Sequence, residues 1–220
     1  MKPTTLGLIH TSATLIPVFQ QLAAQHLPGT KLFNIVDDSL VKNIMARGGT
    51  PDKAIYKRVL DYVRSAEDSG ADYILVTCSS IGDAIEAAAA EVQVPVLRVD
   101  QPMADQAVNT GRRVGVIATL ATTLRPTADL VERRAKLAGK EIALTAIVCE
   151  GAFEALMAGD AQKHDRLVAA GLEELASNVD VILLAQASMA RVVDSLSEAQ
   201  KPVPILTSPP SAMAYIANLG

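Results

Sequence analysis

The sequence repeats a pattern at a spacing of 108 residues: 7–14 aligns with 115–122, and 72–80 aligns with 180–188. In the first match Gly, Ile, Thr, Ala and a second Thr are identical. In the second match Asp, Ile, Leu and the final Ser are identical. Two matches at one spacing predict a chain built from two similar halves. Because only two long copies exist, a solenoid array is excluded.

Short β-branched runs alternate with longer helical patterns in both halves, which is typical of α/β folds with parallel sheets. Glycine, proline and polar residues separate most of these runs. Strands are expected at 6–9, 32–35, 73–76, 96–99, 114–117, 143–148, 181–184 and 205–206, and helices at 51–69, 82–92 and 123–137.

The repeat and the alternation together predict the fold class. We expect an α/β protein of two lobes related by a pseudo-twofold axis, each a parallel sheet flanked by helices, with an active-site cleft between them. The first lobe is expected at 1–100, joined by the C-terminal segment 206–220. The second lobe is expected at 101–205.

Charge and motif content exclude several function classes. A formal net charge of −4 provides no basic surface for nucleic acid or anionic membrane. No apolar run approaches the length of a membrane span or a signal peptide. With two cysteines and no secretory signal, the sequence predicts a cytoplasmic protein with reduced thiols. Dinucleotide, P-loop and metal-ligand motifs are absent, so neither cofactor nor metal is expected.

Small polar residues follow the first and third strands of both halves. Parallel α/β sheets bind ligands beyond the carboxyl ends of their strands, where helix N-termini favour an anion. Each Ser or Thr alone is explained by helix capping, but the set at equivalent points predicts carboxylate binding. If the lobes face each other, four loops line one cleft. These loops carry His10, Thr11, Ser12, Cys78, Ser79 and Ser80 in the first half, and Thr119, Thr122, Thr123, Gln186 and Ser188 in the second.

Cys78 is predicted to be the reactive residue. It ends a strand and precedes a helix, a position that lowers a thiol pKa, and two hydroxyl residues follow it. Cys149 also ends a strand, but it is interpreted as a packing residue, since free cysteine is often a small buried hydrophobe.

The three histidines receive different predictions. His10 directly follows the first strand and could bind substrate or donate a proton. His26 falls in a helical tail and is expected to be solvated. His164 is expected to begin a helix capped by Asp160, and it is a candidate for proton transfer if that helix overhangs the cleft.

Two segments resemble motifs of the aspartate/glutamate racemase superfamily. Residues 76–80, Val-Thr-Cys-Ser-Ser, resemble its first cysteine motif, where Cys-Asn-Thr is common. Residues 116–122 resemble the Gly-Thr-x-x-Thr loop that opens its second half. The resemblance covers nearly the whole chain. It implies cofactor-independent chemistry beside a carboxylate, in which one cysteine removes the α-proton and another returns it from the opposite face.

The chain departs from that pattern at the second cysteine, whose place is taken by Gln186. An amide can donate hydrogen bonds to a developing enolate but cannot carry a proton as a thiolate does. The superfamily also contains one-cysteine arylmalonate decarboxylases and cysteine-dependent maleate isomerases and hydantoin racemases.

The expected function is therefore a cofactor-independent isomerase or racemase-like enzyme. It would act next to a carboxylate of a small acid or amino acid, with Cys78 as thiol acid/base. The alternatives are a one-cysteine decarboxylase or cis-trans isomerase of the same fold, or a non-catalytic protein that binds small carboxylates. The expected partners are a small carboxylate substrate and, as for most such enzymes, a second copy of the chain.

Overall fold

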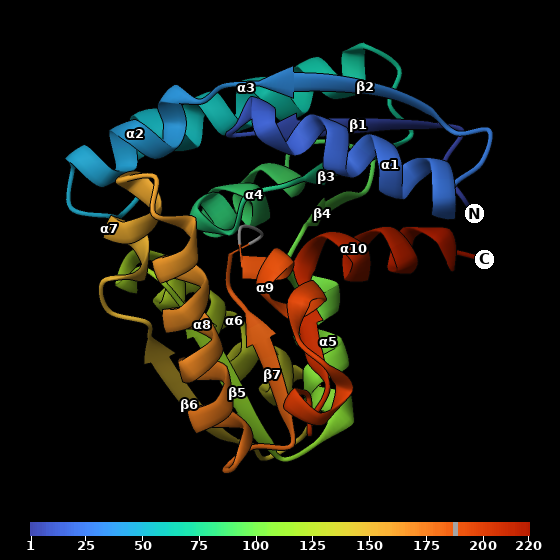
Figure 1. Ribbon diagram of the computed structural model, residues 1–220. Coiled ribbons are helices and arrows are strands. Elements are labelled where there is room, and N and C mark those ends of the chain that lie inside the picture. The colour runs from blue at the N-terminus through green and yellow to red at the C-terminus, as the bar shows by residue number, and fades with distance from the viewer. Residues whose placement is uncertain (187–188) are drawn as a thin grey trace. The chain divides into compact units, whose positions relative to one another are not determined.

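The structure, a computed structural model, describes residues 1–186 and 189–220 (Figure 1). The chain forms two compact units. Unit 1 comprises Met1–Asp100 and Pro209–Gly220, and unit 2 comprises Gln101–Ser208. The C-terminal segment that joins unit 1 begins at Pro209 rather than at Leu206, because Leu206 lies in a strand that pairs within unit 2.

Unit 1 contains a parallel four-stranded sheet with the strand order β2-β1-β3-β4. Each strand coincides within one residue at either end with a strand expected from the sequence. The strands are β1 (Thr5–His10), β2 (Lys31–Val36), β3 (Tyr73–Val76) and β4 (Val96–Arg98).

Unit 2 contains a second parallel sheet with the equivalent order, β6-β5-β7-β8. Its strands are β5 (Arg113–Ala118), β6 (Ala143–Val148), β7 (Val181–Leu184) and β8 (Ile205–Thr207). The prediction of two α/β lobes, each a parallel sheet flanked by helices, is confirmed.

The repeat is also visible in the pairing of the strands. In unit 1 Gly7 lies opposite Ile74, and in unit 2 Gly115 lies opposite Ile182. The aspartate that precedes the third strand of each sheet accepts hydrogen bonds from two successive backbone N–H groups at the start of the first strand. Asp72 accepts from Thr4 and Thr5, and Asp180 accepts from Arg112 and Arg113. The same carboxylate clamp therefore fixes the first and third strands of both sheets.

Helices cover both faces of each sheet. Side chains alternate between the two faces along a strand, so each sheet has two hydrophobic clusters. In unit 1, Ile74 and Val76 pack with α3 and α4, while Tyr73 and Leu75 pack with α1 and α10. The unit 1 helices are α1 (Ile16–His26), α2 (Ser39–Ala46), α3 (Lys53–Asp68), α4 (Gly82–Ala89) and α10 (Ser208–Ala217).

Unit 2 has the same two-cluster organisation. Val181 and Leu183 pack with α5 and α6, whereas Ile182 and Leu184 pack with α8 and α9. Its helices are α5 (Gln101–Thr110), α6 (Ala121–Leu137), α7 (Ala152–Met157), α8 (Ala161–Ala176) and α9 (Ala190–Ser195). Within the described residues, no helix is both long and apolar enough to cross a membrane.

The C-terminal helix returns to unit 1 after the chain has formed unit 2. β4 is the last strand of unit 1 and is followed by α5 of unit 2, while β8 of unit 2 is followed by α10, nearly all of which belongs to unit 1. α10 contributes Ala212, Met213 and Ile216 to the core of unit 1, and all three are fully buried. Unit 1 is therefore built from two stretches of sequence, whereas unit 2 is one continuous stretch.

Candidate functional site

The carboxyl edge of the unit 1 sheet carries most of the predicted residues of the first half. β1 ends at His10 and is followed by Thr11 and Ser12. β3 ends at Val76 and is followed by Thr77 and then Cys78. Since β1 and β3 pair directly, these two loops are neighbours.

Cys78 is half-buried and lies at the N-cap position of a short 3₁₀ turn, Ser79–Ile81, which leads into α4. Burial raises the pKa of the Cys78 thiol, and the negative charge of Asp100 adds to that rise. Hydrogen bonds from the Thr11 side chain and from Ser80 act in the opposite direction by favouring the thiolate. The net direction is upward, contrary to the lowering that its position before a helix predicts, because desolvation of the thiolate is the largest effect.

His10 is fully buried inside unit 1, and both of its ring nitrogens are hydrogen-bonded. Nδ1 lies 2.8 Å from the Thr77 hydroxyl, and Nε2 lies 2.9 Å from Asn34 Oδ1. Burial lowers the pKa of His10, partly offset by its bond to Asn34. The neutral ring therefore holds Thr77, the residue before Cys78, and has no nitrogen free for a ligand. These contacts give His10 a supporting position behind Cys78, and its predicted role in substrate binding stays a prediction.

A buried ion pair lies against the start of α4, the helix that follows the Cys78 turn. Arg98, at the end of β4, donates from Nε and Nη2 to the two carboxylate oxygens of Asp100, at 2.7 and 2.8 Å. The Arg98 and Asp100 side chains are 2% and 0% exposed. Arg98 Nη1 also bonds Glu86, at 2.5 Å. The guanidinium lies directly against Gly82, the first residue of α4.

Replacing Gly82 with alanine should destabilise the protein by about 1–3 kcal/mol, even though alanine is the better helix former. An added Cβ would stand 2.3 Å from Arg98 Cζ, and the guanidinium cannot move aside without breaking its carboxylate bonds. Urea unfolding measures the difference. A G82A variant as stable as the unaltered protein would contradict this account of the contact.

Gln186 occupies in unit 2 the place that Cys78 occupies in unit 1. Its Oε1 accepts hydrogen bonds from the Thr119 backbone N–H at 2.6 Å and from the Thr119 hydroxyl at 2.8 Å. Thr119 is the repeat equivalent of Thr11, which bonds Cys78, so the same cross-strand contact occurs in both units. Because the amide oxygen is already bonded, the amide NH₂ is the group left to donate to a ligand.

The remaining predicted Ser and Thr residues that the structure describes lie at the starts of helices or 3₁₀ turns. Ser12 caps the 3₁₀ turn Ala13–Leu15 and exchanges hydrogen bonds with Thr14. Ser79 is buried and Ser80 is half-buried. Thr122 is exposed and Thr123 half-buried in the first turn of α6. Ser188 lies outside the described residues.

Cys149 and His164 both occupy buried positions in unit 2. The Cys149 Sγ lies 2.8 Å from the position that a Cβ on Gly171 of α8 would take. Burial together with Glu174 raises the pKa of Cys149 to about 11. This supports its interpretation as a packing residue. α8 begins after Asp160, whose carboxylate accepts from the Lys163 backbone N–H at 2.9 Å, so the predicted cap is confirmed.

Sequence reasoning missed two polar clusters at the carboxyl edge of unit 1. One is the Arg98–Asp100 pair. The sequence pattern that could have revealed it is an Arg and an Asp two residues apart at the end of an apolar strand. The other centres on Asp37, which follows β2 and accepts from Tyr62 at 2.5 Å and from Arg58. Burial acts to raise the pKa of Asp37 but is outweighed by the Tyr62, Ser39 and Arg58 contacts, which lower it.

In residues 1–186 and 189–220, no three His, Cys, Asp or Glu side chains are grouped to hold a metal ion.

Comparison with known proteins gives one family match. Residues 6–216 match the family model described as Asp/Glu/Hydantoin racemase. No curated protein sequence matches the chain.

Solved structures share the fold at low sequence identity. A glutamate racemase from Bacillus anthracis has a TM-score of 0.71 at 17% identity, covering 100% of this chain and 82% of that one. An allantoin racemase from Klebsiella pneumoniae has a TM-score of 0.69 at 18% identity, covering 98% and 87%. An aspartate racemase homologue from Pyrococcus horikoshii has a TM-score of 0.71 at 13% identity, covering 98% of both chains.

Proposed function

Because the chain belongs to the Asp/Glu/hydantoin racemase family, we propose that it is a cofactor-independent racemase or isomerase in which the Cys78 thiol carries a proton. Its substrate is a small acid or amino acid, and the reacting carbon is adjacent to a carboxylate. The observation that carries the proposal is the half-buried Cys78 at the carboxyl edge of unit 1, with hydrogen bonds from Thr11 and Ser80.

The surroundings of Cys78 suit a proton carrier. Burial favours the neutral thiol, which can donate a proton, while the Thr11 and Ser80 hydrogen bonds stabilise the thiolate left behind. A group that can exist in either form is what general acid–base catalysis requires. The thiol therefore gives up and recovers a proton within one reaction cycle.

The hydroxyl and N–H groups that begin the helices are the proposed carboxylate ligands. They donate to carboxylate oxygens, and the helix dipole favours the negative charge there. Gln186 is proposed to donate its amide N–H to the enolate that forms when the α-proton leaves. The proposed ligands are Thr11, Ser12, Ser79, Ser80, Thr119, Thr122, Thr123 and Ser188.

One observation favours a second candidate reaction. Gln186 replaces a thiol and holds Thr119 through its carbonyl oxygen, so position 186 provides no second proton carrier. A decarboxylase or a cis-trans isomerase needs only one thiol, either to protonate the enolate left after CO₂ departs or to add transiently to a double bond. Both remain cysteine reactions next to a carboxylate.

Localisation and assembly follow from the same proposal. The two cysteines are free in the structure, which fits a reducing cytoplasm. A homo-oligomer is expected, as for most enzymes of this size.

The test is incubation in D₂O with both enantiomers of aspartate, glutamate, allantoin and a 5-substituted hydantoin, together with maleate and an arylmalonate. NMR reports α-hydrogen exchange, inversion, double-bond isomerisation or loss of CO₂. We expect one probe to be converted by the unaltered protein and not by C78S. If no probe shows a Cys78-dependent change, the proposed function is wrong. Binding of a probe without any conversion would instead assign the chain to carboxylate-binding proteins.

A further inference from the structure

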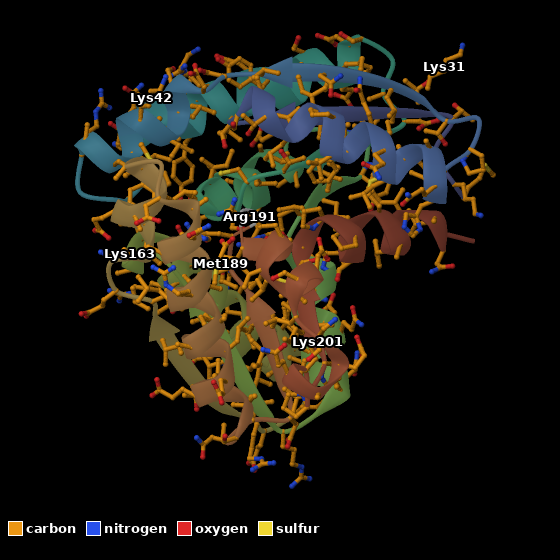
Figure 2. All side chains as sticks on the ribbon, in the orientation of Figure 1. Lys31, Lys42, Lys163, Met189, Arg191 and Lys201 are labelled. Atoms are coloured by element: carbon orange, nitrogen blue, oxygen red, sulfur yellow. The ribbon has the colours of Figure 1, made fainter. Side chains whose placement is uncertain are left out.

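A chain of hydrogen bonds runs across three strands of unit 1 and ends beside Cys78. Asn34 Oδ1 lies 2.9 Å from His10 Nε2, and His10 Nδ1 lies 2.8 Å from the Thr77 hydroxyl. His10 ends β1, and Thr77 follows β3 and directly precedes Cys78. Asn34 lies within β2, the edge strand that begins at exposed Lys31 (Figure 2). His10 is 0% exposed and Thr77 is 6% exposed, so the chain lies inside unit 1.

The neutral His10 ring fixes the direction of these bonds. Because Asn34 Oδ1 is an acceptor, Nε2 carries the ring proton, and Nδ1 accepts the proton of the Thr77 hydroxyl. Thr77 N–H donates to the Ile9 carbonyl oxygen at 2.9 Å, and the hydroxyl lies 3.2 Å from the same oxygen. The ring packs against Phe19 of α1, with 5.8 Å between ring centroids. Thr77 is therefore held to the end of β1 through both its backbone and its side chain.

Unit 2 replaces all three members of this chain with alanine. By the repeat spacing and the strand register, the counterparts of Asn34, His10 and Thr77 are Ala146, Ala118 and Ala185. The backbone is nevertheless the same, because Ala185 N–H donates to Ile117 O at 2.9 Å, as Thr77 N–H donates to Ile9 O at 2.9 Å. The strands therefore pair without the polar chain, and of the two described sheets only the one that precedes the Cys78 loop has it.

This difference matches the side chains at positions 78 and 186. In unit 2, Gln186 joins the two loops itself, since its Oε1 accepts from the Thr119 N–H and hydroxyl at 2.6 and 2.8 Å. A thiol forms only weak hydrogen bonds, so Cys78 cannot hold Thr11 in the same way. A fully bonded buried network makes a core rigid. In unit 1 such a network joins the residue before Cys78 to the residue before Thr11.

We propose that Thr77 is a positioning residue for Cys78, held in place by His10 and Asn34. The inference rests on the proposed function, because it takes the Cys78 thiol to be the proton carrier. Thr77 does not touch the substrate and acts through the hydrogen bond that Cys78 receives from the Thr11 side chain. That bond stabilises the thiolate, so its geometry determines how readily the thiol gives up its proton.

The experiment compares T77V with T77S in the full chain. Valine keeps the shape of threonine but lacks the hydroxyl, whereas serine keeps the hydroxyl. T127V is the matched control, since Thr127 of α6 is 0% exposed and its hydroxyl donates to Thr123 O at 3.2 Å. All variants also carry C149A, which leaves Cys78 as the only thiol. Circular dichroism and thermal unfolding establish that each variant is folded.

T77V should react with iodoacetamide about 3–10-fold more slowly at neutral pH, the equilibrium effect of one lost hydrogen bond. Its pH–rate profile should move to higher pH, since the thiolate loses stabilisation from Thr11. T77S and T127V should stay within about twofold of the C149A protein. Turnover of the probe converted in D₂O should fall about 10–100-fold in T77V, with kcat changed far more than KM. A residue needed only for folding would lower the unfolding temperature without moving the pH–rate profile.

A triple variant keeps the test decisive if T77V leaves the His10 nitrogen unpaired and does not fold. N34A, H10A and T77A together copy the alanines of unit 2 and remove every member of the chain. No buried partner is then left without a hydrogen bond. The triple variant should fold, because unit 2 forms the equivalent sheet with alanine at all three positions, and it should show the same slow alkylation.

Alkylation needs no substrate, so it separates this inference from the proposed function. If T77V and the triple variant react with iodoacetamide as fast as the C149A protein, or faster, Thr77 does not position the thiol, whatever reaction the enzyme catalyses. If alkylation slows as expected but the unaltered protein converts no probe, the proposed function fails, whereas the control of thiol reactivity by Thr77 stands.

Discussion

C78S should convert the preferred substrate about 10²–10⁴-fold more slowly than the unaltered protein. Serine preserves the size of the side chain and can still bond Thr11 and Ser80, so the loop should keep its conformation. A hydroxyl, however, is far too weak an acid to carry a proton at neutral pH. The initial rate of inversion, followed by chiral chromatography or polarimetry, measures the loss.

The matched control is C149A, since Cys149 is the other free thiol and packs against α8 without a proposed role. It should retain turnover within about threefold, apart from a modest stability loss from the truncated core side chain. The raised pKa of Cys78 also means that iodoacetamide should alkylate it slowly at neutral pH, with a rate that climbs as pH increases. Full activity in C78S would remove the thiol from the mechanism.

D100N should lower the free energy of unfolding by about 3–5 kcal/mol, because it removes the principal counter-charge of a buried guanidinium. Asp100 is fully buried and receives two hydrogen bonds from Arg98, which is itself only 2% exposed. Asparagine keeps the shape of the side chain but not its charge, which leaves Glu86, 40% exposed, as the remaining carboxylate partner of Arg98. Urea denaturation gives the free energy of unfolding directly.

The control for this second prediction is D61N in the exposed pair Lys57–Asp61 of α3, whose side chains are 76% and 50% exposed. Surface pairs of this type contribute about 0–1 kcal/mol, so D61N should unfold almost as the unaltered protein does. If D100N and D61N lowered the free energy of unfolding equally, burial would not determine how much the Arg98–Asp100 pair contributes to stability. D100N should also lower the pKa of Cys78, since the charge of Asp100 contributes to raising it.

The fold was largely predictable from the sequence because hydrophobic periodicity and strand spacing are local signals. β3, β6 and β7 have the bounds that the β-branched runs predict, and the 108-residue spacing reappears in the pairing of Gly7 and Gly115. The cap at Asp160 was predictable for the same reason, since a helix cap involves residues three positions apart.

The site was less predictable because burial and long-range hydrogen bonds leave little trace in local sequence. His10 lies at the carboxyl end of a parallel strand, where ligand-binding residues are expected. Both of its ring nitrogens are nevertheless hydrogen-bonded, to Thr77 and Asn34. The pKa of Cys78 rises because of desolvation, which depends on what packs over the loop rather than on the helix that follows it. Arg98 and Asp100 match no sequence motif that would single them out, although the ion pair that they form packs against the start of α4.

The return of α10 to unit 1 has a consequence for biosynthesis. Because Ala212, Met213 and Ile216 complete the core of unit 1, that core stays open until α10 has been synthesised and has left the ribosome. Unit 2 contains a continuous stretch of sequence and can close its core earlier. A ribosome-bound chain would thus carry a folded second half and an unfinished first half, the reverse of the usual N-terminal-first order. Cys78 belongs to the half that matures last.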